Sequence, residues 1–221
     1  SAFARLRRLD GVKQAAEQAL ASGEVPQARA AMKQLTKLYA NRDEMTWALA
    51  RYEERAGEAV DADALLALGE RELMAPLDAL AVQQVEAAAR QVATVTALVP
   101  LAFADVIAAL TANTRMIRAI AEVYGGRAGA LGNWRLVKAV MTHLVATGAV
   151  AMGDDMLGSL AGGGVLGKLS RRFGEGVING ALTARVGVAA MEVCRPMPFR
   201  ANPRPRVTQI IKRSLTGLFG G

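Results

Sequence analysis

The side chains that could carry out covalent chemistry are few. The chain of 221 residues has a single cysteine, Cys194, and a single histidine, His143. One cysteine argues against an internal disulfide and a cysteine-based zinc site, and one histidine argues against histidine metal clusters and histidine-based triads. Apart from these two residues, only scattered carboxylates could act as acids or bases. We therefore expect a non-enzymatic protein with no catalytic residues, no metal site and no cofactor.

Residues 162–170, GGGVLGKLS, come close to the phosphate-binding loop GxxxxGK[ST]. Gly162, Gly167 and Lys168 fit its spacing, but Leu169 stands where that loop needs a hydroxyl group for magnesium. The loop must also follow a buried β-strand, whereas the preceding MGDDMLGSLA has the pattern of a helix or a loop. The glycines are therefore interpreted as a flexible or tightly packed connection.

Two charged pairs flank this segment. Asp154 and Asp155 would point about 100° apart on a helix, so we expect them to cap a helix rather than to share a metal ion. Arg171 and Arg172 could bind phosphate, but a solvated helix face explains them equally well. Neither pair identifies a function.

Residues 176–199, GVINGALTARVGVAAMEVCRPMPF, place the cysteine in an apolar helical segment that two prolines end. Small residues recur in it at spacings of three and four and form one stripe along a helix: Gly176, Gly180, Thr183, Gly187, Ala190 and Cys194. Such a stripe lets another helix approach closely, either from the same chain or from a second subunit. We interpret Cys194 as its last member, with a role in packing.

Two charged residues lie opposite the stripe. Arg185 and Glu192 are about 10.5 Å apart along the helix axis, too far for a simple direct pair. A buried unpaired charge is costly, so each is expected to have another partner. The candidate partners of Arg185 are Asp105, Glu122, Asp154 and Asp155. We regard Asp105, Arg185 and Glu192 as buried polar candidates, and Arg185 as a better functional candidate than Cys194.

The elements that position these residues are expected to be helices throughout. Aromatic residues make up only 5% of the chain, and its apolar positions are mostly Ala, Leu, Val and Met, together with 22 Gly. This mixture suits close-packed helices better than sheets. We predict an all-α fold with amphipathic helical hairpins over residues 1–75, a Gly/Ala-rich, tightly packed helical bundle over residues 76–199, and a basic amphipathic tail over residues 200–221.

Several polar residues and one proline predict where helices begin and end. Asp43 is expected to cap one helix, Asp61 or Asp63 the next, and Asn133 a later one. Pro100 either kinks or divides the long helical segment that contains it. The sequence leaves these two arrangements open.

Two apolar segments could either insert into a membrane or form buried core helices. Residues 91–104 carry no charge, but fourteen residues fall short of the roughly 20 that span a bilayer, and the longer window 91–114 includes Asp105. Residues 133–153 are apolar on nearly all sides and have the same two interpretations. Each segment is either a membrane-inserting helix or a buried core helix.

The net charge of +7 is concentrated toward the C-terminus, because no acidic residue follows Glu192. Arg195 is followed there by five residues predicted to contact a membrane or another anionic partner, which are Arg200, Arg204, Arg206, Lys212 and Arg213. Few aromatic side chains are available for stacking on bases, so an anionic membrane surface is favoured over nucleic acid. The apolar face of residues 207–219 could lie on a membrane, dock on the protein or bind a partner.

Four segments, PLAFADV, NTRMIRAIAEVYGGRAG, RLVKAVMTHL and LTARVGVAAMEVCRPMPF, resemble the YcjF family of bacterial inner-membrane proteins of unknown function. The resemblance extends weakly into FARLRRLDGVKQAAE and so covers nearly the whole chain, with its most specific part over residues 97–199. Related domains are fused to Era-like GTPases, and members of the family are often encoded beside a P-loop protein of the YcjX type.

The resemblance implies a helical domain on the cytoplasmic side of the bacterial inner membrane, paired with a YcjX-type P-loop NTPase. Family members carry two N-terminal membrane helices, which the 221 residues do not include. We expect that they have been removed and that Arg5, Arg7 and Arg8 form the juxtamembrane basic cluster, in agreement with the positive-inside rule. The family has no established reaction, so it supplies no catalytic residues.

Together, these observations favour a membrane-associated scaffold that binds an NTPase partner and anionic lipid. The alternative is a carrier for lipid or another apolar ligand, which would occupy a cavity between the Ala-, Gly- and Met-rich helices. A homo-oligomer could also form, because the stripe of small residues would accept a helix from a second subunit.

Overall fold

The computed structural model describes the backbone of residues 2–98, 102–125, 130–147 and 165–219, and the side chains of residues 9–98, 106–125, 135–147 and 174–216. All the regular secondary structure in these described ranges is helical, so the all-α prediction is confirmed. Pro100 and the pair Asp154 and Asp155 lie outside the described residues, as does Gly162 of the segment that approaches a phosphate-binding loop.

The chain divides into two compact units, each assembled from separate stretches of sequence. Unit 1 consists of Ser1–Ala81, Ala121–Gly132 and Cys194–Arg204, and unit 2 consists of Val82–Ile120, Asn133–Val193 and Pro205–Gly221. The first boundary falls within a single helix, since α5 runs over Ala75–Leu98.

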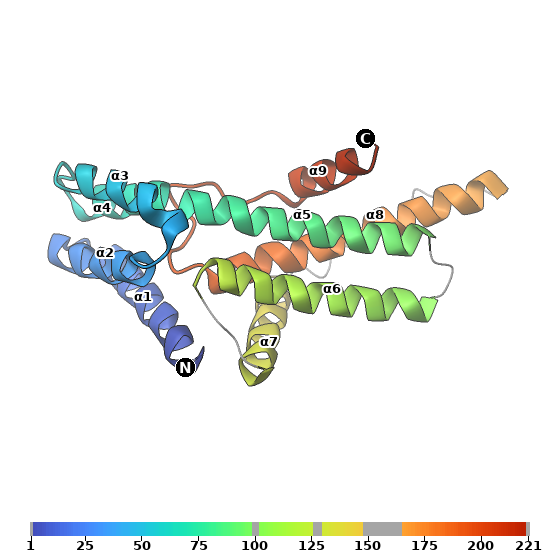
Figure 1. The fold of residues 1–221 in the computed structure, drawn as a ribbon, viewed down its shortest axis with the longest axis horizontal. Coiled ribbons are helices and arrows are strands. Elements are labelled where there is room, and N and C mark those ends of the chain that lie inside the picture. Colours follow the sequence, from blue (N-terminus) through green and yellow to red (C-terminus); the bar gives the residue numbers. More distant parts are fainter. Residues whose placement is uncertain (1, 99–101, 126–129, 148–164, 220–221) are drawn as a thin grey trace. The chain divides into compact units, whose positions relative to one another are not determined.

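Unit 1 contains the short N-terminal helices. They are α1 (Ala2–Ser22), α2 (Val25–Tyr39), the 3₁₀ turn η1 (Asp43–Met45), α3 (Thr46–Ala56), α4 (Ala62–Gly69) and the π-helical turn η2 (Glu70–Met74). Helix α1 packs against α2, and α2 packs against α4 (Figure 1). The large side chains buried in this unit include Met32, Leu35, Tyr39, Met45, Leu73, Met74, Leu77 and Tyr124.

The ends of these helices follow local sequence signals. Gly23 adopts a φ of 67°, a left-handed conformation that glycine adopts without strain, and it ends α1. Asp61 caps α4, since its Oδ1 atom accepts a hydrogen bond of 2.7 Å from the backbone N–H of Ala64. The prediction that Asp43 caps the following helix is wrong. It begins the 3₁₀ turn that buries Met45, and α3 starts only after that turn.

Unit 2 contains the longer helices. They are most of α5, then α6 (Ala102–Val123), α7 (Ala130–Ala146), α8 (Val165–Cys194) and α9 (Val207–Phe219). Of the two arrangements considered around Pro100, the structure has two helices, because α5 ends at Leu98 and α6 begins at Ala102. The prediction that Asn133 caps a helix is wrong, since α7 begins three residues earlier at Ala130, where Ala130 and Leu131 are good helix formers.

The stripe of small residues on α8 faces α5 of the same chain. A side chain at Gly176 would place its Cβ atom 2.6 Å from the carbonyl oxygen of Ala93, and one at Gly187 would lie within 3.0 Å of the Val85 side chain. The two helices therefore approach closely because α8 has glycine at these positions. A hydrogen bond of 3.2 Å from Asn179 Nδ2 to Thr96 Oγ1 also joins them.

Candidate functional site

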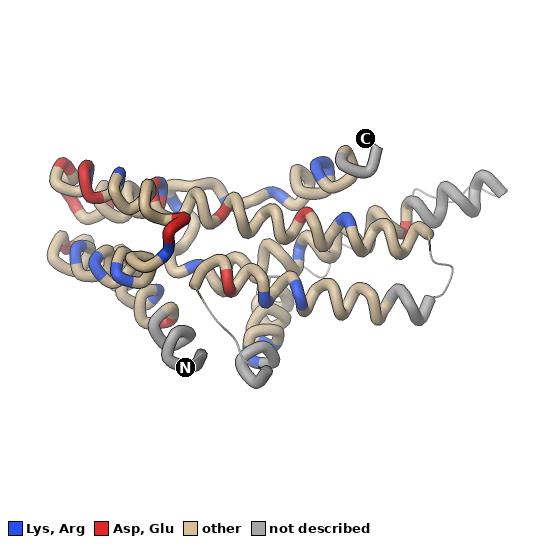
Figure 2. Tube along the Cα trace, viewed as in Figure 1, with Lys and Arg blue, Asp and Glu red and all other residues tan. Residues whose placement is uncertain are grey.

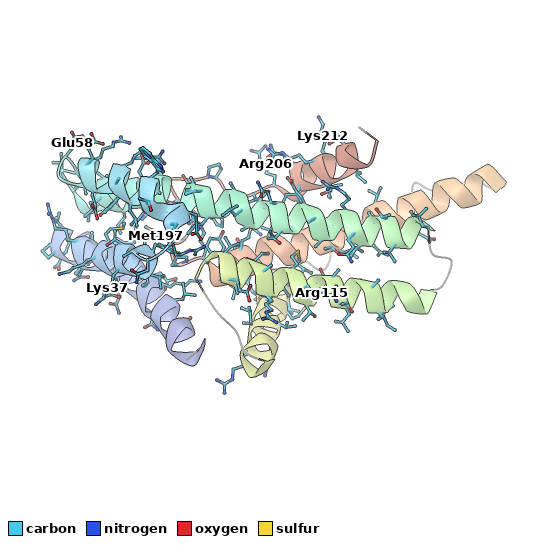
Figure 3. All side chains as sticks on the ribbon, in the orientation of Figure 1. Lys37, Glu58, Arg115, Met197, Arg206 and Lys212 are labelled. Carbon is cyan, nitrogen blue, oxygen red and sulfur yellow. The ribbon has the colours of Figure 1, made fainter. Side chains whose placement is uncertain are left out.

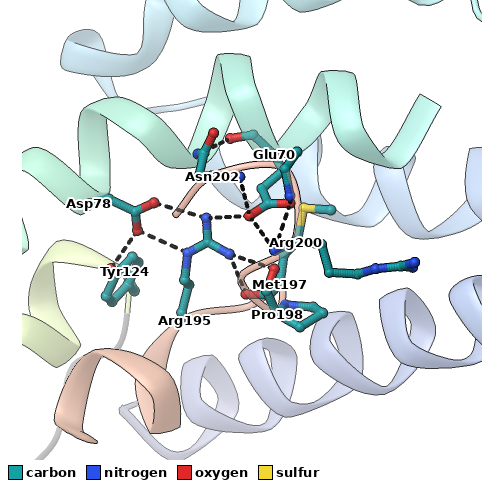
Figure 4. A network of polar contacts seen from close by, with 9 residues as sticks. Glu70, Asp78, Tyr124, Arg195, Met197, Pro198, Arg200 and Asn202 are labelled. Carbon is teal, nitrogen blue, oxygen red and sulfur yellow. Dashed lines mark hydrogen bonds and ion pairs between the residues drawn. The ribbon is translucent and has the colours of Figure 1, made fainter. Parts of the chain in front are cut away.

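Arg195, which follows the last residue of α8, has one of the most heavily hydrogen-bonded side chains described in unit 1 (Figure 4). Pro196 and Pro198 prevent the helix from continuing, so the chain leaves it as a loop. This loop places the Arg195 side chain in the interior, where it is only 1% exposed. A buried guanidinium group requires partners for its positive charge and for its five N–H donors.

All five N–H groups of Arg195 donate hydrogen bonds. Nε and Nη2 donate to the two carboxylate oxygens of Asp78, at 2.9 and 2.8 Å, in a bidentate pair. Nη2 also donates to Glu70 Oε1 at 3.2 Å, and Nη1 donates to the carbonyl oxygens of Met197 and Pro198 at 2.7 and 2.8 Å. The guanidinium carbon lies 4.0 Å from the centre of the Phe199 ring, a cation–π distance.

Glu70 is the second buried charge of this cluster. Its carboxylate accepts hydrogen bonds from three consecutive backbone N–H groups, those of Arg200, Ala201 and Asn202, with distances from 2.6 to 3.3 Å. Consecutive N–H groups that converge on one anion form a nest, a backbone arrangement that binds negative charge. The Asn202 side chain also donates to the carbonyl oxygen of Glu70 at 3.0 Å, so the loop holds the π-helical turn through side chain and backbone.

Asp78 connects the cluster to two buried tyrosines. It accepts a hydrogen bond of 2.7 Å from the Tyr124 hydroxyl, and the carbonyl oxygen of Tyr124 accepts one of 3.1 Å from the Tyr39 hydroxyl. Burial raises the pKa of both tyrosines, and the negative charge of Asp78 raises that of Tyr124 further. Both hydroxyls therefore stay protonated and act as hydrogen-bond donors.

The chemistry of this arrangement is structural. A catalytic acid, base or nucleophile needs a free lone pair or proton directed toward a substrate. Here the donors of Arg195 and the carboxylates of Glu70 and Asp78 are used within the protein. A surface pocket of about 320 Å³ lies beside Glu70, but the carboxylate is occupied by the loop. We name this set of Glu70, Asp78 and Arg195 with the loop 196–202 the arginine clasp.

The candidates for covalent chemistry are not brought together in either unit. Cys194 belongs to unit 1, where burial raises the pKa of its thiol to about 12, so that little thiolate forms at neutral pH. His143 belongs to unit 2, where its Nε2 atom lies 2.9 Å from Glu192 Oε2. This contact links α7 to α8 and gives Glu192 the partner that the sequence required. In the ranges with described side chains, no three His, Cys, Asp or Glu residues lie close enough to hold a metal ion.

The other predicted polar residues are placed as follows. Arg185 is half-buried on α8. The side chain of Asp105, one of its predicted partners, lies outside the described residues, so the pairing of Arg185 with Asp105 stays a prediction. Thr183, Ala190 and Cys194 of the stripe are buried along with its glycines.

The predicted basic contact residues divide between the units. Arg200 and Arg204 belong to unit 1, where Arg200 lies 3.6 Å from Asp63. Arg206, Lys212 and Arg213 belong to unit 2, where Arg213 lies 3.5 Å from Glu86. Figure 2 shows Lys and Arg in blue along the chain, including on α9. Arg206 and Lys212 are exposed (Figure 3) and, among the described residues, have no side-chain partner.

Helix α9 docks on unit 2 through its apolar face. Ile210 and Ser214 are each 2% exposed. The Ser214 hydroxyl donates to the carbonyl oxygen of Glu86 at 3.2 Å, and Arg90 Nε donates to the carbonyl oxygen of Ser214 at 3.2 Å. Of the three arrangements open for residues 207–219, the structure therefore has the docked one.

The sequence interpretation missed the arginine clasp. Arg195 was counted with the basic tail, and no role was assigned to Glu70 or Asp78. One signal was available, because Arg195 stands among Cys194, Pro196 and other apolar residues, which favours burial over a solvated face. Nothing in the sequence pattern connects it to acids more than a hundred positions earlier.

Within the described residues, one helical stretch is long and apolar enough to cross a membrane by length and composition, Gly174–Cys194 with a mean hydropathy of 1.3. In the structure 56% of it is buried, as is common for a core helix of a soluble protein. This stretch is weak evidence for a membrane span.

Comparison with known proteins identifies relatives along nearly the whole chain. A UPF0283 membrane protein of Rhizobium meliloti is 48% identical over 189 residues, which are 86% of this chain and 53% of that protein. One of Rhizobium etli is 44% identical and covers 94% of this chain and 58% of itself. One of Agrobacterium fabrum is 40% identical and covers 98% of this chain and 60% of itself. The chain thus spans little more than half the length of these relatives.

No solved structure matches the chain. The family model described as a domain of unknown function, DUF697, matches residues 60–220, well over half of the sequence. This match and the UPF0283 relatives agree with the resemblance to YcjF-type membrane proteins. The chain therefore belongs to the DUF697 family.

Proposed function

We propose that this chain is a non-enzymatic domain on the cytoplasmic side of a bacterial inner-membrane protein. It acts as a membrane-associated scaffold or partner for a P-loop NTPase. Support for the membrane comes from the relatives, which are named membrane proteins and extend well beyond the segment shared with this chain. Support for a scaffold comes from the arginine clasp, whose charged groups form hydrogen bonds within the protein.

The proposed contact with lipid depends on the exposure of Arg206 and Lys212 and on their lack of an ion-pair partner in the part of the chain that the structure describes. Both are exposed at α9, and neither has a side-chain partner among the described residues. Because α9 docks through Ile210 and Ser214, this part of its apolar face is covered, and Arg206 and Lys212 offer positive charges on the exposed side. Fixed cations next to an anionic leaflet each contribute about 1 kcal/mol to binding.

A charge-reversal experiment tests this role. Arg206→Glu with Lys212→Glu removes two favourable contacts and adds two repulsive ones, so binding to vesicles of phosphatidylglycerol and phosphatidylcholine should weaken at least about thirty-fold. The matched control reverses two exposed cations of α2, Arg29→Glu with Lys33→Glu, with the same change in net charge. Equal binding by the α9 variant and the wild-type chain, measured by co-sedimentation at low salt, would disprove the role of α9.

The NTPase partner is proposed from the YcjF resemblance, and a binding experiment can test it directly. The full 221-residue chain is immobilised, and a purified YcjX-type P-loop protein is passed over it with and without nucleotide. Saturable binding supports the partnership. Absence of binding in both nucleotide states contradicts the NTPase part of the proposal and leaves the lipid-facing part to the vesicle experiment.

The alternative function, carriage of a lipid or another apolar ligand, has less support. Two pockets among the described residues of unit 1 are surface features of about 380 and 320 Å³, at the small end of ligand sites. One is lined by Gly11, Val12, Gln34, Lys37 and Leu38, which is a mixed surface for an acyl chain. Native mass spectrometry of the purified chain decides the question, since a carrier should retain a lipid and a scaffold should show the mass of the protein alone.

A further inference from the structure

We propose that the end of unit 2 where α5 meets α6 inserts its aliphatic side chains shallowly into a lipid bilayer. We call Leu98, Val106, Ile107 and Leu110 the aliphatic tip. Their exposed fractions are 71%, 65%, 53% and 66%, high values for large apolar side chains. The inference rests on the proposed membrane association and adds a specific contact surface to it.

The tip continues a face of α6 that is buried farther along the helix. At about 100° per residue, Ile117 points between Val106 and Leu110 when the helix is viewed along its axis. Ile117 is only 1% exposed, whereas the other two are more than half exposed. One apolar face of α6 is therefore covered in its second half and uncovered in its first half.

The two helix ends that form the tip lie close together. Three residues separate Leu98 from Ala102, so the ends of α5 and α6 are at most about 15 Å apart (Figure 1). Residues 91–104 contain no charged side chain. Asp105 is thus the single acidic or basic residue between positions 91 and 114, and the four large aliphatic side chains of the tip are exposed to solvent.

Positive charge lies at the depth expected for lipid phosphates. Arg115 is exposed on α6 (Figure 3). It follows Leu110 by five residues, which corresponds to about 7.5 Å along the helix axis. With the tip among the upper acyl chains, the long Arg115 side chain can reach headgroup phosphates. Fourteen uncharged residues are too few to cross a bilayer, and Asp105 follows at once, so the contact is interfacial.

A lipid surface fits these observations better than a second copy of the chain. The tip is purely aliphatic, without the aromatic side chains that are enriched in protein interfaces. Its nearest described exposed charge on α6 is a cation, which repels its equivalent in a symmetric pair and attracts anionic headgroups. The relatives, moreover, are named membrane proteins.

Vesicle partitioning of the full 221-residue chain tests the inference. Ile107→Ser with Leu110→Ser should lower partitioning at least about ten-fold, into phosphatidylcholine vesicles and into vesicles that also contain phosphatidylglycerol. The matched control, Val60→Ser with Leu80→Ser, removes exposed aliphatic side chains from unit 1 and should bind like the wild-type chain. Circular dichroism confirms that each variant keeps its helices.

The outcomes separate this inference from the proposed function. If the tip variant partitions like the wild-type chain while the α9 charge reversal weakens binding, the tip inference is overturned and the lipid-facing proposal stands. If the wild-type chain binds neither vesicle, both fail. If the tip variant instead converts a dimer to a monomer in light scattering and vesicle binding is unchanged, the surface pairs two copies and the inference is overturned.

A depth probe gives an independent reading. An environment-sensitive dye is attached to an Ile107→Cys variant, in which the buried Cys194 should stay unlabelled. Its emission should shift to the blue and brighten when phosphatidylcholine vesicles are added, whereas the same dye on a Val60→Cys variant should not respond. Unchanged emission from the dye at position 107 on a chain that is bound to vesicles would overturn the inference.

Discussion

Replacing Arg195 with methionine should be among the most damaging single changes in unit 1. The variant Arg195→Met keeps a long side chain but removes five hydrogen bonds and the positive charge between two acids. Asp78 loses two of its three hydrogen bonds and keeps the one from Tyr124, while Glu70 keeps its backbone donors. Both acids are left with a charge that is mostly excluded from water, because their side chains are only 13% and 3% exposed.

The expected loss of stability follows from these contacts. Breaking a buried ion pair from one side typically costs about 3 to 5 kcal/mol, out of a total stability of about 5 to 15 kcal/mol for a domain. In urea, with an m-value of about 3 kcal/mol per molar, the midpoint should fall by between about 1 and 2 M. The measurement is helical circular dichroism as a function of urea concentration.

The control is an arginine with similar pairing but with access to water. Arg55 lies 2.8 Å from Glu72, yet its side chain is 54% exposed, so Arg55→Met should cost about 0.5 kcal/mol or less. A double-mutant cycle adds Asp78→Asn, and the double variant should lose less stability than the two single variants together. If Arg195→Met costs no more than Arg55→Met, or if the effects of Arg195→Met and Asp78→Asn add, the clasp does not have the role assigned to it.

Three further predictions concern packing, capping and titration. Gly176→Ala should destabilise the protein by about 1 to 3 kcal/mol although alanine favours helices, because its Cβ atom meets the carbonyl oxygen of Ala93; unchanged thermal stability would contradict this close approach. Asp61→Ala should cost about 1 kcal/mol through the lost bond to Ala64, while Asp61→Asn should restore most of it in urea titrations. Cys194 should react with a thiol reagent at pH 8 only when urea unfolds the chain. Because the folded state holds this thiol proton more tightly than the unfolded state, stability should fall as the pH rises from about 9 toward 12.

The fold was largely predictable because its signals are local. Helical periodicity, the cap at Asp61 and the glycine after α1 all act within a few residues of the chain. The misplaced caps at Asp43 and Asn133 show the limit of such signals, since a short 3₁₀ turn or one more turn of helix moves the boundary. The sequence identified the stripe of small residues on α8, but it did not identify α5 as the helix that packs against this stripe.

The arginine clasp could not be predicted from local patterns. Its members come from a π-helical turn, the start of α5 and a loop after α8, and only the folded chain brings them together. A charged residue is buried only when partners exist, and the partners of Arg195 are set by tertiary structure. The aliphatic tip was partly predictable, because residues 91–104 are uncharged, but only the structure shows which of the nearby side chains remain exposed.

The clasp also has a consequence for how the protein is made. The hydrogen bonds that join its two acids to Arg195 and to residues 200–202 connect positions 117 to 132 apart, so a ribosome must synthesise the chain past residue 202 before Glu70 and Asp78 gain all of these partners. Contacts at such separation form slowly, and the first 81 residues emerge with two acids that have no counter-charge. The helices of unit 1 therefore remain an incomplete folding unit until residues 194–204 have been synthesised.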